Sequence, residues 1–129
     1  MTAFVDTDVL VDCLRGTRAA YDWLNANSAQ EFCVPGIVAM ELVVGCRNQA
    51  DLNRVHRLLS TFEVVWPDQT EFAAAFDLLS HYRLRDGLSI PDCIIAAMAI
   101  QHNAVLYTFN VKHFASVEGC ELAQPYERA

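Results

Sequence analysis

The chain has 129 residues, of which 53% are hydrophobic; this predicts one folded domain over residues 1–129 and excludes a disordered chain. The formal net charge is −7 and Lys112 is the only lysine, which argues against a protein that binds nucleic acid mainly through a broad basic surface. No apolar run approaches the roughly 20 residues of a membrane-spanning helix, and residues 1–6 lack the regions of a signal peptide.

The cysteines indicate a reducing environment. They are odd in number, widely spaced and embedded in apolar runs, and no two of them form a CxxC pair: Cys13, Cys33, Cys46, Cys93 and Cys120. We therefore expect free, buried thiols in a cytoplasmic protein, with no disulfide framework and no zinc site.

Along the chain, short apolar runs alternate with longer segments of helical pattern. Strands are predicted at 3–5, 32–34, 63–66 and 104–108, with a weak one at 120–122. Helices are predicted at 7–14, 17–27, 37–46, 49–61, 68–82 and 90–100. Residues 83–87 are expected to form a loop, 109–114 a tight turn and 125–129 a frayed tail. Alternation of this kind predicts a three-layer α/β/α fold with a mostly parallel sheet of four to five strands.

Two of the predicted helices carry an isolated acid. Glu41 is the only charge in the helix at 37–46, so we expect it to be partly buried and to need a partner. Asp92 lies in the first turn of the helix that begins near Ser89, where the helix dipole favours a carboxylate. The helix at 68–82 is expected to begin at Asp68 with a capping box and to turn an apolar stripe inward: Phe72, Phe76, Leu79 and Tyr82.

The polar residues of greatest interest follow strands or begin helices next to them. Asp6 ends the first strand, and Asn110 follows the fourth. In open parallel sheets, ligands bind at the carboxyl ends of the strands, where Asp6, Glu41, Asp92 and Asn110 can converge. Carboxylates gathered in one pocket repel one another unless a cation neutralises them, and oxygen-only ligands suit Mg²⁺ or Mn²⁺.

The chain resembles the PIN-domain ribonucleases, and in size and motif order the VapC toxins of toxin–antitoxin pairs. The resemblance rests on four motifs that follow in order over most of the chain: residues 4–10, Glu41 in its apolar helix, residues 91–97 and residues 108–114. It implies that Asp6, Glu41 and Asp92 bind metal, and that Asn110 stands where the family often has Asp. Asp8 either supplies a further carboxylate or caps the first helix.

This resemblance implies a Mg²⁺-dependent endoribonuclease, with Mn²⁺ as an alternative ion, that leaves 5′-phosphate and 3′-hydroxyl ends. It also implies a homodimer and a VapB-type antitoxin that blocks the acidic pocket with a basic or aromatic segment. From charge alone, the candidates for holding the RNA backbone are Arg15, Arg18, Arg47 and Lys112.

Two other functions stay open. One is a PIN-like module with weak catalysis that binds RNA or a protein, because Asn110 adds no charge to the site. The other is a phosphatase of the haloacid-dehalogenase type, because 6–8 resemble its Asp-x-Asp nucleophile motif. The chain lacks the later acidic pair of that family, which makes it the weaker alternative. The four histidines are expected to have surface or capping roles.

Overall fold

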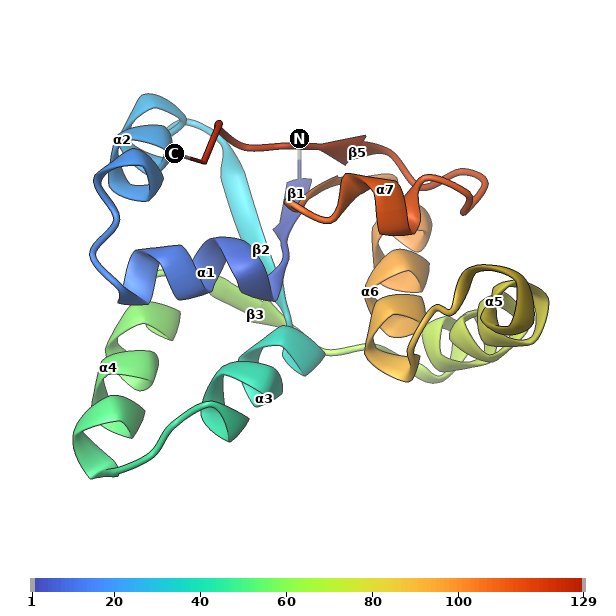
Figure 1. The fold of residues 1–129 in the computed structure, drawn as a ribbon, viewed down its shortest axis with the longest axis horizontal. Helices are drawn as coiled ribbons and strands as arrows, with labels where there is room; N and C mark the ends of the chain where they lie inside the picture. Colours follow the sequence, from blue (N-terminus) through green and yellow to red (C-terminus); the bar gives the residue numbers. More distant parts are fainter. Residues whose placement is uncertain (1, 129) are drawn as a thin grey trace.

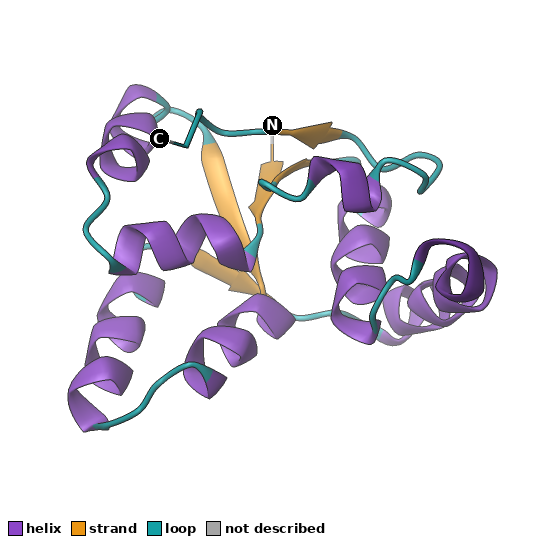
Figure 2. Ribbon diagram, in the orientation of Figure 1, coloured by secondary structure: helices purple, strands orange, loops and turns teal. Residues whose placement is uncertain are grey.

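The structure is a computed structural model that describes residues 2–128. Its five strands are β1 (Thr2–Val5), β2 (Glu31–Pro35), β3 (Glu63–Val65), β4 (Val105–Tyr107) and β5 (Leu122–Ala123). Its helices are α1 (Thr7–Leu14), α2 (Arg18–Ala26), α3 (Gly36–Val44), α4 (Gln49–Leu59), α5 (Gln69–Asp86), α6 (Ile90–Gln101) and α7 (Val111–Phe114). Figures 1 and 2 show the helices arranged around the central sheet.

The strands form one parallel sheet in the order β3-β2-β1-β4-β5. The chain builds outward from β1 to β3 in one direction and then from β4 to β5 in the other. The order therefore reverses between β1 and β4, which pair directly, with Val5 opposite Tyr107. This is the point at which open α/β sheets bind ligands. The predicted fold class is confirmed.

Helices cover both faces of the sheet. On one face the Phe4 ring contacts His102 at the end of α6, with 5.3 Å between the ring centroids. On the other face Trp23 of α2 packs against Phe32 and Tyr107. The helix α6 is buried along its whole middle, from Cys93 to Ala99, as its small apolar sequence predicts. Among residues 2–128, no helix combines the length and the apolar character that crossing a membrane requires.

The predictions for α5 were wrong in two respects. The segment at 83–87 is not a loop, because the helix continues to Asp86 and ends at Gly87, whose φ of +72° is the left-handed conformation that glycine adopts easily. Phe72 and Phe76 also do not face inward, since they are 51% and 69% exposed. The buried face of α5, which packs on α6, is formed by Glu71, Ala75 and Tyr82.

The predicted frayed tail was also wrong for the part of it that the structure describes; Ala129 lies outside the described residues. Tyr126 packs against Trp23 and Phe109, and Arg128 forms an ion pair with Asp12 of α1. A frayed end would make no such contacts. Sequence pattern could not reveal them because the partners lie far away along the chain.

The buried Glu71 fixes the start of α5 against the end of α6. Its Oε1 accepts a hydrogen bond of 2.9 Å from the backbone of Asp68, which completes the predicted capping box, and its Oε2 lies 3.1 Å from His102 Nε2. Glu71→Ala is therefore expected to lower the free energy of unfolding by about 1–3 kcal/mol.

Urea unfolding checks this expectation, with Asp77→Ala as the control on the same helix. Asp77 is exposed, so its replacement should change stability by no more than about 0.5 kcal/mol. Equal midpoints for the two variants would contradict the role given to Glu71.

Candidate active site at the carboxyl edge of the sheet

Asp6 lies directly after β1 and is the N-cap residue of α1. Its Oδ1 accepts a hydrogen bond of 2.8 Å from the backbone N–H of Thr7, and its Oδ2 accepts one of 2.8 Å from the hydroxyl of Thr108. The residue is only 9% exposed. Burial, and then the neighbouring charges of Asp8 and Asp92, raise the pKa of Asp6 to about 6, although the two hydrogen bonds oppose this.

Asp8 does not cap the helix, because Asp6 does. Instead Asp8 turns toward the end of β4, where its Oδ2 accepts a hydrogen bond of 3.1 Å from the backbone N–H of Phe109. Burial holds the pKa of Asp8 above its ordinary value, although the hydrogen bond from the Phe109 N–H and the charge of Arg128 oppose this increase. Its Oδ1 is buried and has no hydrogen-bond partner among the residues described. A buried carboxylate oxygen without a partner is costly, and a cation would satisfy it.

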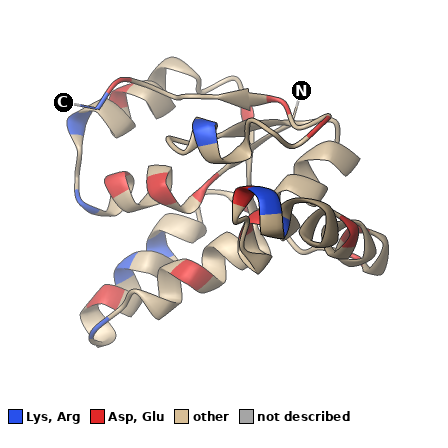
Figure 3. Cartoon of the chain, turned by 45° about the vertical axis from the view of Figure 1, so that its right-hand side comes forward, with Lys and Arg blue, Asp and Glu red and all other residues tan. Residues whose placement is uncertain are grey.

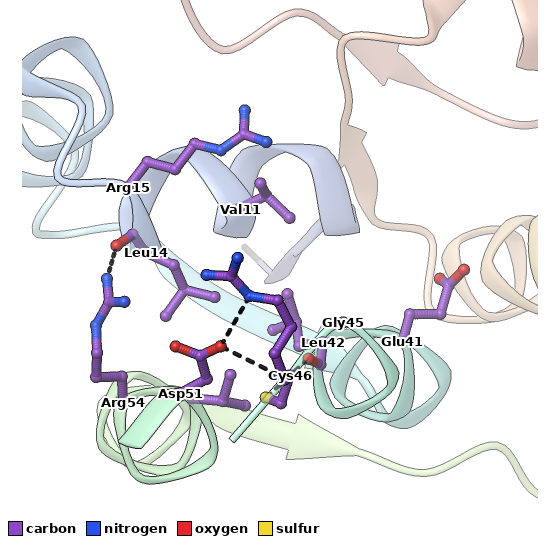
Figure 4. Close-up of a pocket in the computed structure, with 11 residues that line it drawn as sticks. Val11, Leu14, Arg15, Glu41, Leu42, Gly45, Cys46, Asp51 and Arg54 are labelled. Atoms are coloured by element: carbon purple, nitrogen blue, oxygen red, sulfur yellow. Dashed lines mark hydrogen bonds and ion pairs between the residues drawn. The ribbon is translucent and has the colours of Figure 1, made fainter. Parts of the chain in front are cut away.

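Glu41 lies on α3 and has the partner that its apolar helix predicted. Its Oε1 accepts a hydrogen bond of 2.9 Å from the hydroxyl of Thr7, whose backbone N–H is already bound to Asp6. Thr7 thus connects the two acids. In Figure 4 the carboxylate of Glu41 points away from the arginine-lined cavity between α1, α3 and α4.

Asp92 is held at the first turn of α6. Its Oδ2 accepts hydrogen bonds from the backbone N–H and the hydroxyl of Ser89, at 3.0 and 2.7 Å. The same oxygen lies 2.8 Å from Nε2 of His113 on α7. The sequence analysis gave His113 a surface or capping role and so missed this contact, which joins residues 21 positions apart.

Asn110 reaches the same edge of the sheet but is exposed. Its backbone N–H donates a hydrogen bond of 3.0 Å to the hydroxyl of Thr108. Its side chain makes no capping hydrogen bond to α7. The structure therefore connects Asn110 to Asp6 and Asp8 through Thr108, not by direct contact between the side chains.

The arrangement suits a divalent cation. Asp6, Asp8 and Glu41 form no ion pair with a lysine, arginine or histidine among residues 2–128. In Figure 3, acidic residues lie along α1, and several basic residues lie on α4. Asp6 is buried and is repelled by Asp8 and Asp92, and one oxygen of Asp8 has no partner among the residues described. Hard carboxylate oxygens of this kind are the donor set that Mg²⁺ and Mn²⁺ prefer.

A second group of potential metal ligands lies elsewhere, at the start of β2 and β3. One ligand atom from each of Glu31, Cys33 and Glu63 lies within 4.8 Å of the others. Within the described part of the chain, the acids at the carboxyl edge are not packed this tightly. Thr7 and Thr108 connect Asp6 to Glu41 and Asp8, whereas Asp92 is held separately by Ser89 and His113. The group at β2 and β3 contains a thiol, so its donor set differs from the oxygen-only set predicted for Mg²⁺.

Comparison with known proteins agrees with this fold. The family model of the PIN domain matches residues 3–119, which defines the class of protein. Two ribonucleases of Mycobacterium tuberculosis, VapC10 and VapC19, are each 35% identical to the chain; both alignments span 95% of it, with 91% and 98% of the relatives covered. The chain therefore belongs to the PIN-domain family, among the VapC ribonucleases.

Solved structures show the same similarity. A toxin–antitoxin complex from Klebsiella pneumoniae contains a chain that is 32% identical, with a TM-score of 0.78 and coverage of 98% of this chain and 99% of that one. VapBC2 from Rickettsia felis, solved with a DNA fragment from its promoter, superposes with a TM-score of 0.85 at 20% identity, over 98% of this chain and 100% of that chain. The latter match concerns the fold alone.

Proposed function

We propose that this chain is a divalent-metal-dependent endoribonuclease and the toxin of a VapBC-type toxin–antitoxin pair. The observation that carries the proposal is the group of carboxylates at the point where the strand order reverses: Asp6 is buried there, close enough to the half-buried Asp8 and Asp92 for their charges to raise its pKa. The names of the VapC relatives support an RNA substrate.

Asp6, Glu41 and Asp92 would hold the Mg²⁺ or Mn²⁺ ion, Asp8 would supply a further carboxylate, and Asn110 would act as a weaker ligand through its amide oxygen. Such an ion supplies Lewis-acid activation of water and neutralises the charge of the phosphodiester.

The chain's own polar residues orient the acids. The Thr7 hydroxyl directs Glu41, the Thr108 hydroxyl directs Asp6, and His113 with Ser89 fixes the Oδ2 of Asp92. Hydrogen bonds of this kind set ligand geometry before substrate arrives. Hydrolysis by the family's chemistry would leave a 5′-phosphate and a 3′-hydroxyl.

We propose that basic side chains beside the site contact the RNA backbone. Arg15, Arg18, Arg47 and Lys112 are all exposed. Arg18 is paired with Asp22 on α2, and Arg47, which precedes α4, is paired with Asp51 on that helix. Arg15 and Lys112 form no ion pair within residues 2–128. Arg15 also lines a cavity of about 520 Å³ between α1, α3 and α4 (Figure 4). Arg15 and Lys112 are therefore the better candidates for phosphate contacts.

A cognate VapB-type antitoxin is the proposed protein partner. The toxin–antitoxin complexes among the similar structures support this assignment. The uncompensated acids at the carboxyl edge favour an antitoxin segment with a basic side chain, which would neutralise them and block the site.

We also propose a homodimer formed by the exposed apolar surface of α3, the β3–α5 connection and α5. The members of this surface are all at least half exposed: Met40, Val44, Trp66, Phe72 and Phe76. The Trp66 ring covers Gly36, where an added Cβ would come within 2.2 Å of it, and Met40 follows one helical turn later. Large apolar patches on a protein surface mark interaction sites, and a second copy offers the same surface.

Phe76→Glu is expected to make the protein monomeric, because a charge buried in an apolar interface is left without a partner. Light scattering after gel filtration measures the mass. Leu84→Glu is the control, since Leu84 is 99% exposed on the same helix, two turns beyond Phe76, and its replacement should leave the mass unchanged. Equal masses for wild type and Phe76→Glu would refute the proposed surface.

Cleavage of a single-stranded RNA with and without Mg²⁺ or Mn²⁺ tests the proposed activity. The wild-type chain should cut internally only with the ion, and Asp92→Asn should lower the rate by about a hundredfold or more, because one ligand charge is lost.

Glu63→Gln is the matched control, because it removes a carboxylate from the group at β2 and β3 and should leave the rate unchanged. Tight RNA binding without cleavage would favour the binding module instead. Release of phosphate from a small phosphoester without RNA cleavage would favour the phosphatase.

Finally, we propose that residues 1–129 act as a single PIN-like domain in the cytoplasm. One sheet contains all five strands, and one core cluster joins residues from β1 to the α7 region. All five cysteines are free thiols, and three of them are buried, which suits a reducing compartment.

A further inference from the structure

The C-terminal tail is tied to α1 through Asp12. The hydroxyl of Tyr126 donates a hydrogen bond of 2.8 Å to Asp12 Oδ2. Arg128 binds the same carboxylate with Nε and Nη2, each at 3.2 Å, so that both carboxylate oxygens are engaged. Asp12 is only 6% exposed. This buried acid is thus fully paired, in contrast to Asp8 one helical turn earlier.

Arg128 also contacts the two segments that meet beside Asp8. Its Nη2 donates a hydrogen bond of 3.1 Å to the backbone carbonyl of Asp8. Its guanidinium carbon lies 3.8 Å from the ring centroid of Phe109, the residue whose N–H binds the Asp8 carboxylate. Tyr126 packs on the same ring, with centroids 5.0 Å apart. The side chain of Arg128 therefore fixes the position of α1 relative to the turn after β4.

We propose that Arg128 is a positioning residue of the active site, which holds the Phe109 N–H against the Asp8 carboxylate by clamping both segments. Its effect on the metal site rests on the proposed function, but the clamp itself does not. Phe109 lies between Thr108, which orients Asp6, and Asn110. A shift of this turn therefore moves the Thr108 hydroxyl, the Phe109 N–H and Asn110 together.

The contacts require an arginine. Its planar group binds the two Asp12 oxygens side by side and at the same time stacks on an aromatic ring, which a lysine ammonium does not do. Outer-shell partners of metal ligands typically change metal affinity by 10–100-fold when they are removed. If the tail only stabilised the fold, replacing Arg128 would lower the free energy of unfolding without changing the geometry of the metal ligands.

The test compares Arg128→Met and Arg128→Lys with Arg85→Met in the full chain. Arg85 is the matched control because it too pairs with an acid, Asp86, and lies over an aromatic ring, Tyr82, but it is on α5. Two readouts are measured: Mn²⁺ affinity by calorimetry, and the exchange rate of the Phe109 amide proton by NMR in the metal-free protein.

Arg128→Met should weaken Mn²⁺ binding about tenfold and speed Phe109 amide exchange about tenfold, and Arg128→Lys should not restore either value. Arg85→Met should match the wild type in both. Tyr126→Phe should have a smaller effect in the same direction, because it loses one bond to Asp12 and keeps the ring contact.

Unchanged amide exchange and unchanged Mn²⁺ affinity in Arg128→Met would overturn the proposal. Wild-type protein that binds no Mn²⁺ would instead refute the proposed metal-dependent function. In that case the amide exchange of Phe109 still decides whether Arg128 clamps the turn.

Discussion

Asp6→Asn is expected to lower RNA cleavage about a thousandfold while making the metal-free protein more stable at pH 7.5. The loss of cleavage follows because a ligand charge worth several kcal/mol to the transition state is removed. The gain in stability follows because burial and the charge of Asp8 raise the pKa of Asp6 to about 6, so its ionised form destabilises the fold at neutral pH. The amide oxygen of the asparagine can accept the hydrogen bond from the Thr7 N–H, and its NH₂ group can donate to the hydroxyl oxygen of Thr108. The gain should be about 1–3 kcal/mol.

Cleavage assays with Mg²⁺ and urea unfolding in a chelator measure the two effects on the same preparation. Asp12→Asn is the control for the stability result, because Asp12 is also buried on α1 but is paired with Arg128. Its replacement should destabilise the fold, since the guanidinium loses its anionic partner. Both effects of Asp6→Asn must appear together. A destabilised Asp6→Asn protein would show that the ionised carboxylate of Asp6 does not lower the stability of the fold.

The sequence alone was sufficient for the features that depend on local pattern. Apolar runs located the strands, and α6 begins beside Ser89 with Asp92 in its first turn, as predicted. The rule that parallel strands end at one edge then placed Asp6 and Asn110 near each other. The sequence could not distinguish the two faces of α5, where aromatic residues and a glutamate compete for the inward position. Burial there is decided by the shape of α6, against which Glu71 and Ala75 fit.

What sequence could not supply is the pairing of residues that are distant along the chain. The bond between His113 and Asp92, the N–H of Phe109 on Asp8 and the clamp of Arg128 each join separate elements. No spacing rule connects such residues, because the turn after β4 and the tail are positioned by the packed sheet. For the same reason, the sequence left two roles open for Asp8, and the structure excludes capping: Asp6 is the N-cap residue, and Asp8 binds the N–H of Phe109 after β4.

The stability of the metal-free protein should decrease as pH rises from about 4 to about 6. The folded-state pKa of Asp6 is about 6, above its ordinary value of 3.8, so between these values the folded state binds more protons than the unfolded state. Stability then decreases with rising pH by linkage and levels off above the folded pKa. Burial raises the pKa of Asp8 as well, which adds to the same trend. Stability thus changes with pH in the opposite direction to that of a protein with a salt-bridged carboxylate, whose stability increases as pH rises.

A divalent cation should remove this loss, because it binds only the folded protein and only when the acids are ionised. At a Mg²⁺ concentration about 100 times its dissociation constant the gain is about 2.7 kcal/mol, and it should be present at pH 7.5 and nearly absent at pH 4. Urea unfolding across this range, with Mg²⁺ and with chelator, gives both curves. Subtracting the curve of Asp6→Asn isolates Asp6 from the other titrating groups. If the subtracted curve is flat between pH 4 and 6, then Asp6 ionises without cost, and the carboxyl edge does not need a cation to be stable.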